Sequence, residues 1–245
     1  MKIYIRLFLL IIGCFICGCG KNEEVKVDSY IEETETSEKN QNYHVEKIEV
    51  LEKDSLGGIV AAYAYDLVMF DVNNPEYKQI NQRLEELYEV YEESYKELFF
   101  EYVYSGRDSD YKTGDYPYYC TSKLKSIYED KDYISVVMEE YWYAGGVSST
   151  DIRAYNFHVK TGEVLYMDDV LGMQAANAKQ YVINVIYSQL EFMNSRQEIM
   201  GIEAFLEELK VEDFKFYLDE EGMKVFFNTG EIASNAAGVL VFEVQ

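Results

Sequence analysis

The chain has 245 residues, of which 45 are acidic and 22 basic, and its formal net charge is −23 at pH 7. A chain this acidic repels phosphate backbones, which excludes nucleic acid as a partner and favours cationic proteins, peptides or metal ions. Solubility alone is the more common explanation of such a charge.

The first residues are typical of a bacterial lipoprotein signal. Two basic residues precede an apolar run that begins at Leu7, and the run is shorter than the ~20 apolar residues that cross a bilayer as a helix. Ile16-Cys17-Gly18-Cys19 then has the form of a lipobox, whose cysteine thiol takes a diacylglycerol. We therefore expect residues 1–18 to be a signal peptide. The acyl chains on Cys19, palmitate among them, would anchor the protein at the extracytoplasmic face of the cell membrane. The alternative is an ordinary signal peptide in which Cys19 is incidental.

After this signal is removed, the only cysteine besides Cys19 is Cys120, so no intrachain disulfide is available. A single cysteine of this kind is usually a small buried apolar residue and less often a reactive thiol.

The segment 19–42 is rich in Glu, Lys, Ser and Thr and almost lacks apolar residues. Such a composition cannot bury enough surface to fold, so it predicts a disordered acidic tether between the lipid and a folded domain. The folded part then begins near Tyr43, and we divide it into two halves, residues 43–130 and 131–245.

The folded part has the pattern of an α+β protein, with antiparallel sheets and two main helices packed on them. Asn74 and Pro75 have the form of a helix N-terminus, and apolar residues at a spacing of three or four follow from Ile80 to Phe99. A second main helix is expected at 174–194 and a short one at 202–209. Asp130-Lys131 and Lys160-Thr161-Gly162 are expected to be turns. The expected strands are 43–52, 58–70, 118–128, 132–142, 151–159, 214–218, 224–227 and 239–244.

Tyrosine is abundant, with 24 residues, and its flat ring and hydroxyl suit sugar or protein surfaces as well as strands and cores. The clearest concentration is Tyr141, Trp142 and Tyr143, followed by Gly145 and Gly146, which would let a partner approach the backbone closely. These five residues are the candidate partner-binding site. A β-bulge at the glycine pair is the alternative, and the one we favour for the glycines themselves.

The sequence contains no strong catalytic pattern, no nucleotide-binding loop and no cluster of metal-ligand spacing, and we therefore expect a protein that is not an enzyme and needs no cofactor or metal. The weak acidic candidates are Asp168, Asp169 and Glu231, which as a carboxylate pair could act on a glycosidic bond. Helix capping explains Asp168 and Asp169 equally well, and a hydrogen bond within a loop explains Glu231.

Four segments of the C-terminal half carry a resemblance to a known family: Tyr141–Gly146, Tyr155–Leu165, Asp168–Leu171 and Phe226–Gly238. This half is similar to the domain of unknown function 3298, which occurs in the ectodomains of RsiV-type anti-sigma factors and beside the catalytic domain of some peptidoglycan deacetylases. Residues 43–130 resemble in layout family 4163, which commonly precedes it. The chain departs from the usual motifs at Val147-Ser148, Thr229-Gly230 and Ser234-Asn235.

This resemblance implies an extracytoplasmic α+β domain, and in the anti-sigma relatives that domain binds lysozyme, a cationic protein. The leading hypothesis is therefore a membrane-anchored binding or sensor lipoprotein that recognises lysozyme or a cell-envelope component such as peptidoglycan. A peptidoglycan-directed hydrolase that uses paired carboxylates and a structural envelope protein without a ligand are the alternatives.

Overall fold

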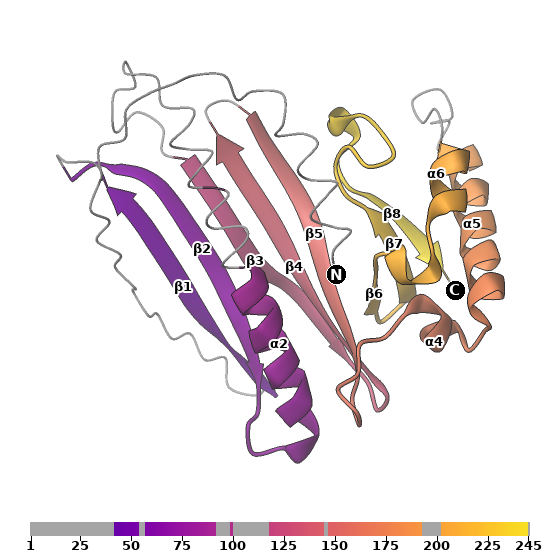
Figure 1. Ribbon diagram of the computed structural model, residues 1–245, viewed down its shortest axis with the longest axis horizontal. Coiled ribbons are helices and arrows are strands. Elements are labelled where there is room, and N and C mark those ends of the chain that lie inside the picture. The colour runs from indigo at the N-terminus through magenta and orange to yellow at the C-terminus, as the bar shows by residue number, and fades with distance from the viewer. Residues whose placement is uncertain are drawn as a thin grey trace.

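The structure is a computed structural model in which the described residues form two β-sheets with helices on their outer faces (Figure 1). The larger sheet has the strand order β1-β2-β3-β4-β5 and the smaller one the order β6-β7-β8. This is the α+β class that the sequence predicts. The residues described are 42–53, 57–91, 99, 118–144, 147–192 and 202–244.

The larger sheet is antiparallel except at one place. β2 and β3 run parallel over five paired positions, from Ala61 with Tyr118 to Tyr65 with Ser122. A parallel pair needs a long crossover connection, and helix α2 lies in the chain between these two strands. The strands are β1 (Tyr43–Lys53), β2 (Ile59–Phe70), β3 (Tyr118–Glu129), β4 (Tyr133–Ala144) and β5 (Val147–His158).

Helix α2 (Lys78–Tyr91) covers one face of the larger sheet (Figure 1). It follows a single 3-10 turn, Pro75–Tyr77, whose N-cap is Asn74; the Asn74 side chain accepts a hydrogen bond of 3.1 Å from the Glu76 N–H. The predicted helix start is confirmed. Apolar side chains at the predicted spacing, Ile80, Leu84 and Tyr88, are buried beneath the helix.

The β3–β4 turn forms where the sequence predicts it, because the Asp130 carboxylate accepts hydrogen bonds from the N–H groups of Asp132 and Tyr133, at 2.8 and 2.7 Å. The start of β5 differs from the prediction. The strand begins at Val147, not at 151, because it pairs continuously with β4 from Tyr133 with His158 to Ala144 with Val147.

The bulge that we favour at the glycine pair concerns Gly145 and Gly146, which lie outside the described residues, between the last paired positions of β4 and β5. The register shift within this part of the sheet falls in β3, between Leu124 and Ser126.

The second half of the structure contains the smaller sheet and three helices, of which α5 and α6 lie close to the predicted positions. None of the helices in the described part of the chain is long and apolar enough to cross a membrane. The elements are α4 (Met167–Leu171), α5 (Ala175–Phe192), α6 (Ile202–Glu208), η4 (Val211–Asp213), β6 (Phe216–Asp219), β7 (Gly222–Phe227), η5 (Asn235–Ala237) and β8 (Leu240–Val244).

The smaller sheet lies between helices α5 and α6 and the larger sheet (Figure 1). On one of its faces Val225 packs with Ile186 and Leu206 of the helices, and all three side chains are fully buried. On the other face Phe226 packs with Val137 of β4 and Ile152 of β5. The molecule therefore has four layers: α2, the larger sheet, the smaller sheet, and the pair α5 and α6.

The boundary that we placed near residue 130 falls in the turn between β3 and β4, two hydrogen-bonded strands of one sheet. The sheets themselves divide the chain later, between His158 at the end of β5 and Met167 at the start of α4.

Candidate binding site

Strand alternation separates the three aromatic residues that the sequence groups into one site. Trp142 pairs with Cys120 of β3 and is half-buried against the core cluster that contains Tyr63 and Cys120, on the face of the sheet beneath α2. Tyr141 and Tyr143 project from the opposite face because successive side chains of a strand alternate. The prediction that Trp142 shares one surface with Tyr141 and Tyr143 is thus wrong, because its side chain lies on the other face of the sheet.

The opposite face carries a cross-strand array that we call the tyrosine face. Directly paired residues in an antiparallel sheet place their side chains on the same side, close enough to contact each other. Tyr119 pairs with Tyr143, which pairs with Ser148; Thr121 pairs with Tyr141, which pairs with Thr150. Tyr119 is 40% and Tyr141 38% exposed, high for such large side chains. The tyrosine face consists of Tyr119, Thr121, Tyr141, Tyr143, Ser148 and Thr150.

The tyrosine face continues into a groove of about 340 Å³ between β5 and the chain that leads from β7 to β8. Ser148 and Thr150 belong to both the face and the groove. The groove adds a hydroxyl from Thr229 and an amide from Asn235. Ser148, Thr229 and Asn235 are positions at which this chain departs from the resembled motifs, and folding brings them together here.

Two charged residues line the groove, and they have opposite signs. Lys125 Nζ lies 3.3 Å from Glu139 Oε2, and both side chains are about half exposed. The Lys125 position follows from the register shift in β3, since a bulge redirects the side chain at the extra residue. Although the whole chain has a charge of −23, the described lining of this groove is close to neutral.

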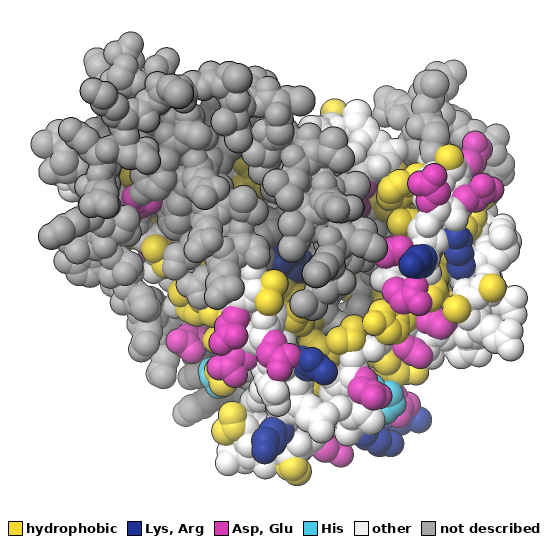
Figure 2. Space-filling model, in the orientation of Figure 1, with side chains coloured by type: hydrophobic (Ala, Val, Ile, Leu, Met, Phe, Trp, Pro, Cys, Tyr) yellow, Lys and Arg dark blue, Asp and Glu magenta, His cyan; other side chains and the backbone are white. Residues whose placement is uncertain are grey.

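Acidic side chains instead lie over other parts of the surface. Figure 2 shows Asp and Glu side chains spread across the described part of one side of the molecule, without a single concentrated patch. Within the described groove lining, Glu139 is the only acidic residue.

The segment after β7 that forms one wall of the groove is hydrogen-bonded to the free edge of β5. The Asn228 amide oxygen accepts a hydrogen bond from the Ile152 N–H at 2.9 Å, and the Asn228 amide nitrogen donates to the Ile152 carbonyl at 3.0 Å. The Thr229 hydroxyl donates to the Thr150 carbonyl, also at 3.0 Å. These contacts occupy backbone groups that an edge strand would otherwise expose.

The weak acidic candidates lie outside the groove, and two of them, Asp169 and Glu231, have structural partners. Glu231 Oε2 accepts a hydrogen bond from the Asn228 N–H at 2.8 Å, and its other oxygen pairs with Lys215. Asp169 Oδ2 accepts from the Tyr166 N–H at 2.9 Å, and Asp168 stands beside it in the first turn of α4. The loop hydrogen bond is confirmed for Glu231 and the helix cap for Asp169. Within the described residues, no three His, Cys, Asp or Glu side chains are grouped to hold a metal ion.

A buried polar group lies on the face beneath α2. Arg153 Nε is 2.8 Å from Glu140 Oε1, and Arg153 Nη2 donates to Glu140 Oε2 at 3.1 Å. Burial raises the pKa of Glu140, and the charge of Arg153 opposes that shift. Burial likewise raises the pKa values of Tyr65 and Tyr155. Since this group lies on the side of the sheet away from the groove, it contributes to the core and not to the candidate site.

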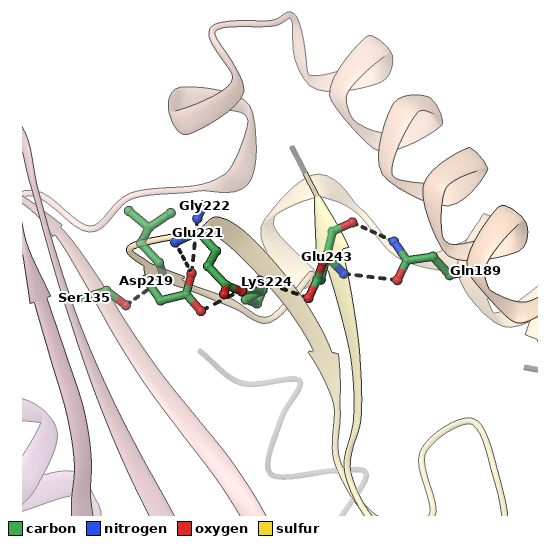
Figure 3. Close-up of polar contacts among 8 residues, drawn as sticks. Ser135, Gln189, Asp219, Glu221, Gly222, Lys224 and Glu243 are labelled. Carbon is green, nitrogen blue, oxygen red and sulfur yellow. Dashed lines mark hydrogen bonds and ion pairs between the residues drawn. The ribbon is translucent and has the colours of Figure 1, made fainter.

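The smaller sheet holds a buried cation that the sequence did not reveal. Lys224 Nζ lies 2.9 Å from Glu221, 3.3 Å from Glu243 and 3.9 Å from Asp219, and its side chain is only 7% exposed (Figure 3). Burial lowers the pKa of Lys224, but its hydrogen bonds to these glutamates and the nearby charges outweigh burial and raise it. Glu221 is three residues from Lys224 in the chain, whereas Asp219 of β6 and Glu243 of β8 come near it because their strands pair with β7.

Neighbouring contacts hold this sheet at both edges. The Gln189 side chain of α5 donates to the Glu243 carbonyl at 2.6 Å and accepts from the Glu243 N–H at 3.2 Å (Figure 3). On the β6 side, Ser135 Oγ of the larger sheet accepts from the Leu218 N–H at 3.0 Å. Together with the ion pairs of Lys224, these contacts form a cluster that stabilises the smaller sheet.

The fold and the groove define an α+β protein of two packed sheets with a candidate ligand-binding face. Residues 168–245 match the family described as "Protein of unknown function (DUF3298)", so the resemblance seen in the C-terminal sequence is confirmed over that range. The match begins within α4 and spans the smaller sheet and its helices.

Two solved structures of DUF3298 proteins match this chain. A DUF3298 family member from Bacteroides fragilis NCTC 9343 is 14% identical, with a TM-score of 0.54, over 82% of this chain and 89% of that one. A DUF3298 family protein from Pseudomonas aeruginosa PAO1 is 12% identical, with a TM-score of 0.49, over 89% and 90% of the two chains. None of the curated proteins matches this chain. The first of these structures supports the fold, since the similarity covers 82% of this chain.

Proposed function

We propose that this protein is a lipid-anchored, extracytoplasmic binding protein that recognises a cell-envelope component or a cationic protein such as lysozyme. The observation that carries the proposal is the tyrosine face, where Tyr119 and Tyr141 are exposed beside a groove rich in hydroxyl groups. Tyrosine offers a rigid apolar ring and a polar hydroxyl at a low cost in side-chain entropy, and it is therefore common in recognition surfaces.

The membrane anchor in this proposal depends on the lipobox that ends at Cys19 and on the acidic segment after it. A lipid at Cys19 would tether the folded part outside the cell, and the self-repelling tether would hold it away from the membrane surface.

Binding without catalysis is the second part of the proposal. Asp169 and Glu231 are engaged in a helix cap and in a loop, respectively, and neither lines the groove. A hydrolytic pair would need two carboxylates facing one substrate, whereas Glu139 stands in the groove beside a lysine.

The proposal is tested by binding of the full chain, purified in non-ionic detergent, to insoluble peptidoglycan by sedimentation and to hen lysozyme by calorimetry. We expect saturable binding to at least one of them. Tyr141→Ala should weaken that binding at least about tenfold, as truncation of an aromatic anchor commonly does. Tyr166→Ala is the matched control, because Tyr166 is similarly exposed, at 43%, but lies at the start of α4. If the protein bound neither peptidoglycan nor lysozyme, the proposed function would be refuted.

A further inference from the structure

The charge of the candidate site restricts the kind of ligand that it fits. The groove is lined by one lysine and one glutamate that pair with each other, in a chain of charge −23. A cationic protein would gain little from a site where the negative charge is neutralised, and an anionic polymer would be repelled by the rest of the surface. A neutral, polar ligand is the class that this balance favours.

The shape and chemistry of the site favour a sugar polymer within that class. Tyr119 and Tyr141 lie diagonally across β3 and β4, at a separation of about 7–8 Å for such positions. Exposed aromatic rings can pack against the C–H faces of sugar rings. The hydroxyls of Ser148 and Thr150 can donate to and accept from sugar hydroxyls, and the Thr229 hydroxyl, which donates to the Thr150 carbonyl, can still accept from one.

The tyrosine face and the groove are continuous, which gives the site an extended form. Ser148 and Thr150 border both, so a ligand packed on Tyr141 can extend toward Thr229 and Asn235 without leaving the surface. An extended site with repeated aromatic and hydroxyl contacts suits a polymer of repeated sugar units better than a compact small molecule.

We propose that the tyrosine face and its groove bind an uncharged polysaccharide strand, with sugar rings against Tyr119 and Tyr141 and sugar hydroxyls bonded to Ser148, Thr150, Thr229 and Asn235. This inference rests on the proposed function, which places recognition at the same surface, and it selects glycan over protein as the ligand.

Calorimetry of the full chain in non-ionic detergent with soluble oligomers of N-acetylglucosamine tests this inference, and lysozyme is titrated in a separate arm. We expect the oligomers to bind more tightly as their length increases. Their affinity should stay nearly constant between ~0.1 M and ~1 M NaCl, where the Debye length falls from about 10 to about 3 Å.

Variants locate the site. Tyr141→Ala should weaken oligomer binding at least about tenfold, Tyr141→Phe less because it keeps the ring, and Tyr166→Ala not at all. Thr150→Val, which removes a groove hydroxyl and nearly keeps the side-chain shape, should weaken it severalfold. Urea unfolding of each variant shows whether the fold is retained.

The outcomes separate the two proposals. Salt-sensitive lysozyme binding that is lost in Tyr141→Ala, with no oligomer binding, overturns the polysaccharide inference and leaves the proposed function standing. Oligomer binding that is unchanged in Tyr141→Ala and Thr150→Val also overturns the inference, because the ligand then binds elsewhere. Absence of binding to oligomers, lysozyme and peptidoglycan overturns both.

Discussion

At the scale of single residues, Asn228 and Glu231 form hydrogen bonds that hold the chain after β7 in place against β5. Asn228 makes both of its hydrogen bonds to the backbone of Ile152, and Glu231 binds the N–H of Asn228 as well as Lys215. Each side chain forms hydrogen bonds with partly buried backbone or charged groups that have no partner in the β-sheet hydrogen-bond pattern. These structural contacts therefore account for Asn228 and Glu231 without a catalytic role.

Asn228→Ala should destabilise the protein by about 1–3 kcal/mol, because it leaves the N–H and the carbonyl of Ile152 without their partners. Urea unfolding measures the change. Asn184→Ala, at an exposed position of α5, is the control and should change stability by no more than about 0.5 kcal/mol. Equal effects of the two substitutions would show that Asn228 does not fasten the β5 edge.

At the scale of elements, the turn after β5 is fitted against the start of α2. Gly162 has φ of 64°, and a Cβ added there would lie 2.5 Å from the Cβ of Gln79. The glycine is therefore needed both for its backbone conformation and for the close approach of turn and helix. Because Val159 and Phe157 at the end of β5 belong to the core cluster under α2, this turn helps to position the strand that carries the groove.

Gly162→Ala tests this packing against Gly172→Ala, since Gly172 has a similar φ of 61° but no atom within 4 Å of the added Cβ. Both substitutions should cost about 1–2 kcal/mol for the left-handed conformation. Gly162→Ala should cost a further 1–3 kcal/mol, on the order expected for overpacking. The difference between the two urea-unfolding free energies measures the contact, and a difference of zero would contradict it.

At the scale of the whole molecule, the four layers place the candidate site where two sheets meet. The smaller sheet covers the part of the larger one near Val137 and Ile152, and Tyr119 and Tyr141 lie further along the same face, where they are exposed. A site at such a junction draws one wall from each sheet. The same architecture leaves the N-terminal end of β1, at Tyr43, as the point from which the tether would run to the membrane.

The anchoring part of the proposal predicts that Cys19→Ser abolishes incorporation of labelled palmitate and releases the protein from the membrane fraction, because a lipid chain supplies about 0.8 kcal/mol per buried methylene. Cys17→Ser is the matched control, since serine is also small and the lipobox remains intact; it should still be labelled and sediment with membranes. Labelling that persists in Cys19→Ser would place the lipid elsewhere.

Local patterns were enough to predict the elements. The alternation in residues 43–52 and the Asn74-Pro75 pair correctly predicted a strand and a helix start, because strand alternation and N-capping depend on near neighbours in the chain. The parallel pairing of β2 with β3 was not predicted, since pairing of distant strands leaves no local pattern. Tyr119 was missed as a site residue for the same reason: only the register with β4 brings it beside Tyr143.

The sequence by itself determined the α+β class, most element positions, the structural alternatives for Asp169 and Glu231, and the likeness of the C-terminal part to DUF3298. The tertiary structure decided which side chains share a surface. It packed Trp142 against the core on the opposite face, placed Tyr119 on the same face as Tyr141, and brought Thr229 and Asn235 to the groove. The physical reason is that composition and the spacing of apolar residues act within one segment of the chain. Strand register and sheet packing bring together residues far apart in the chain, and so they set the charge of the site that these residues form.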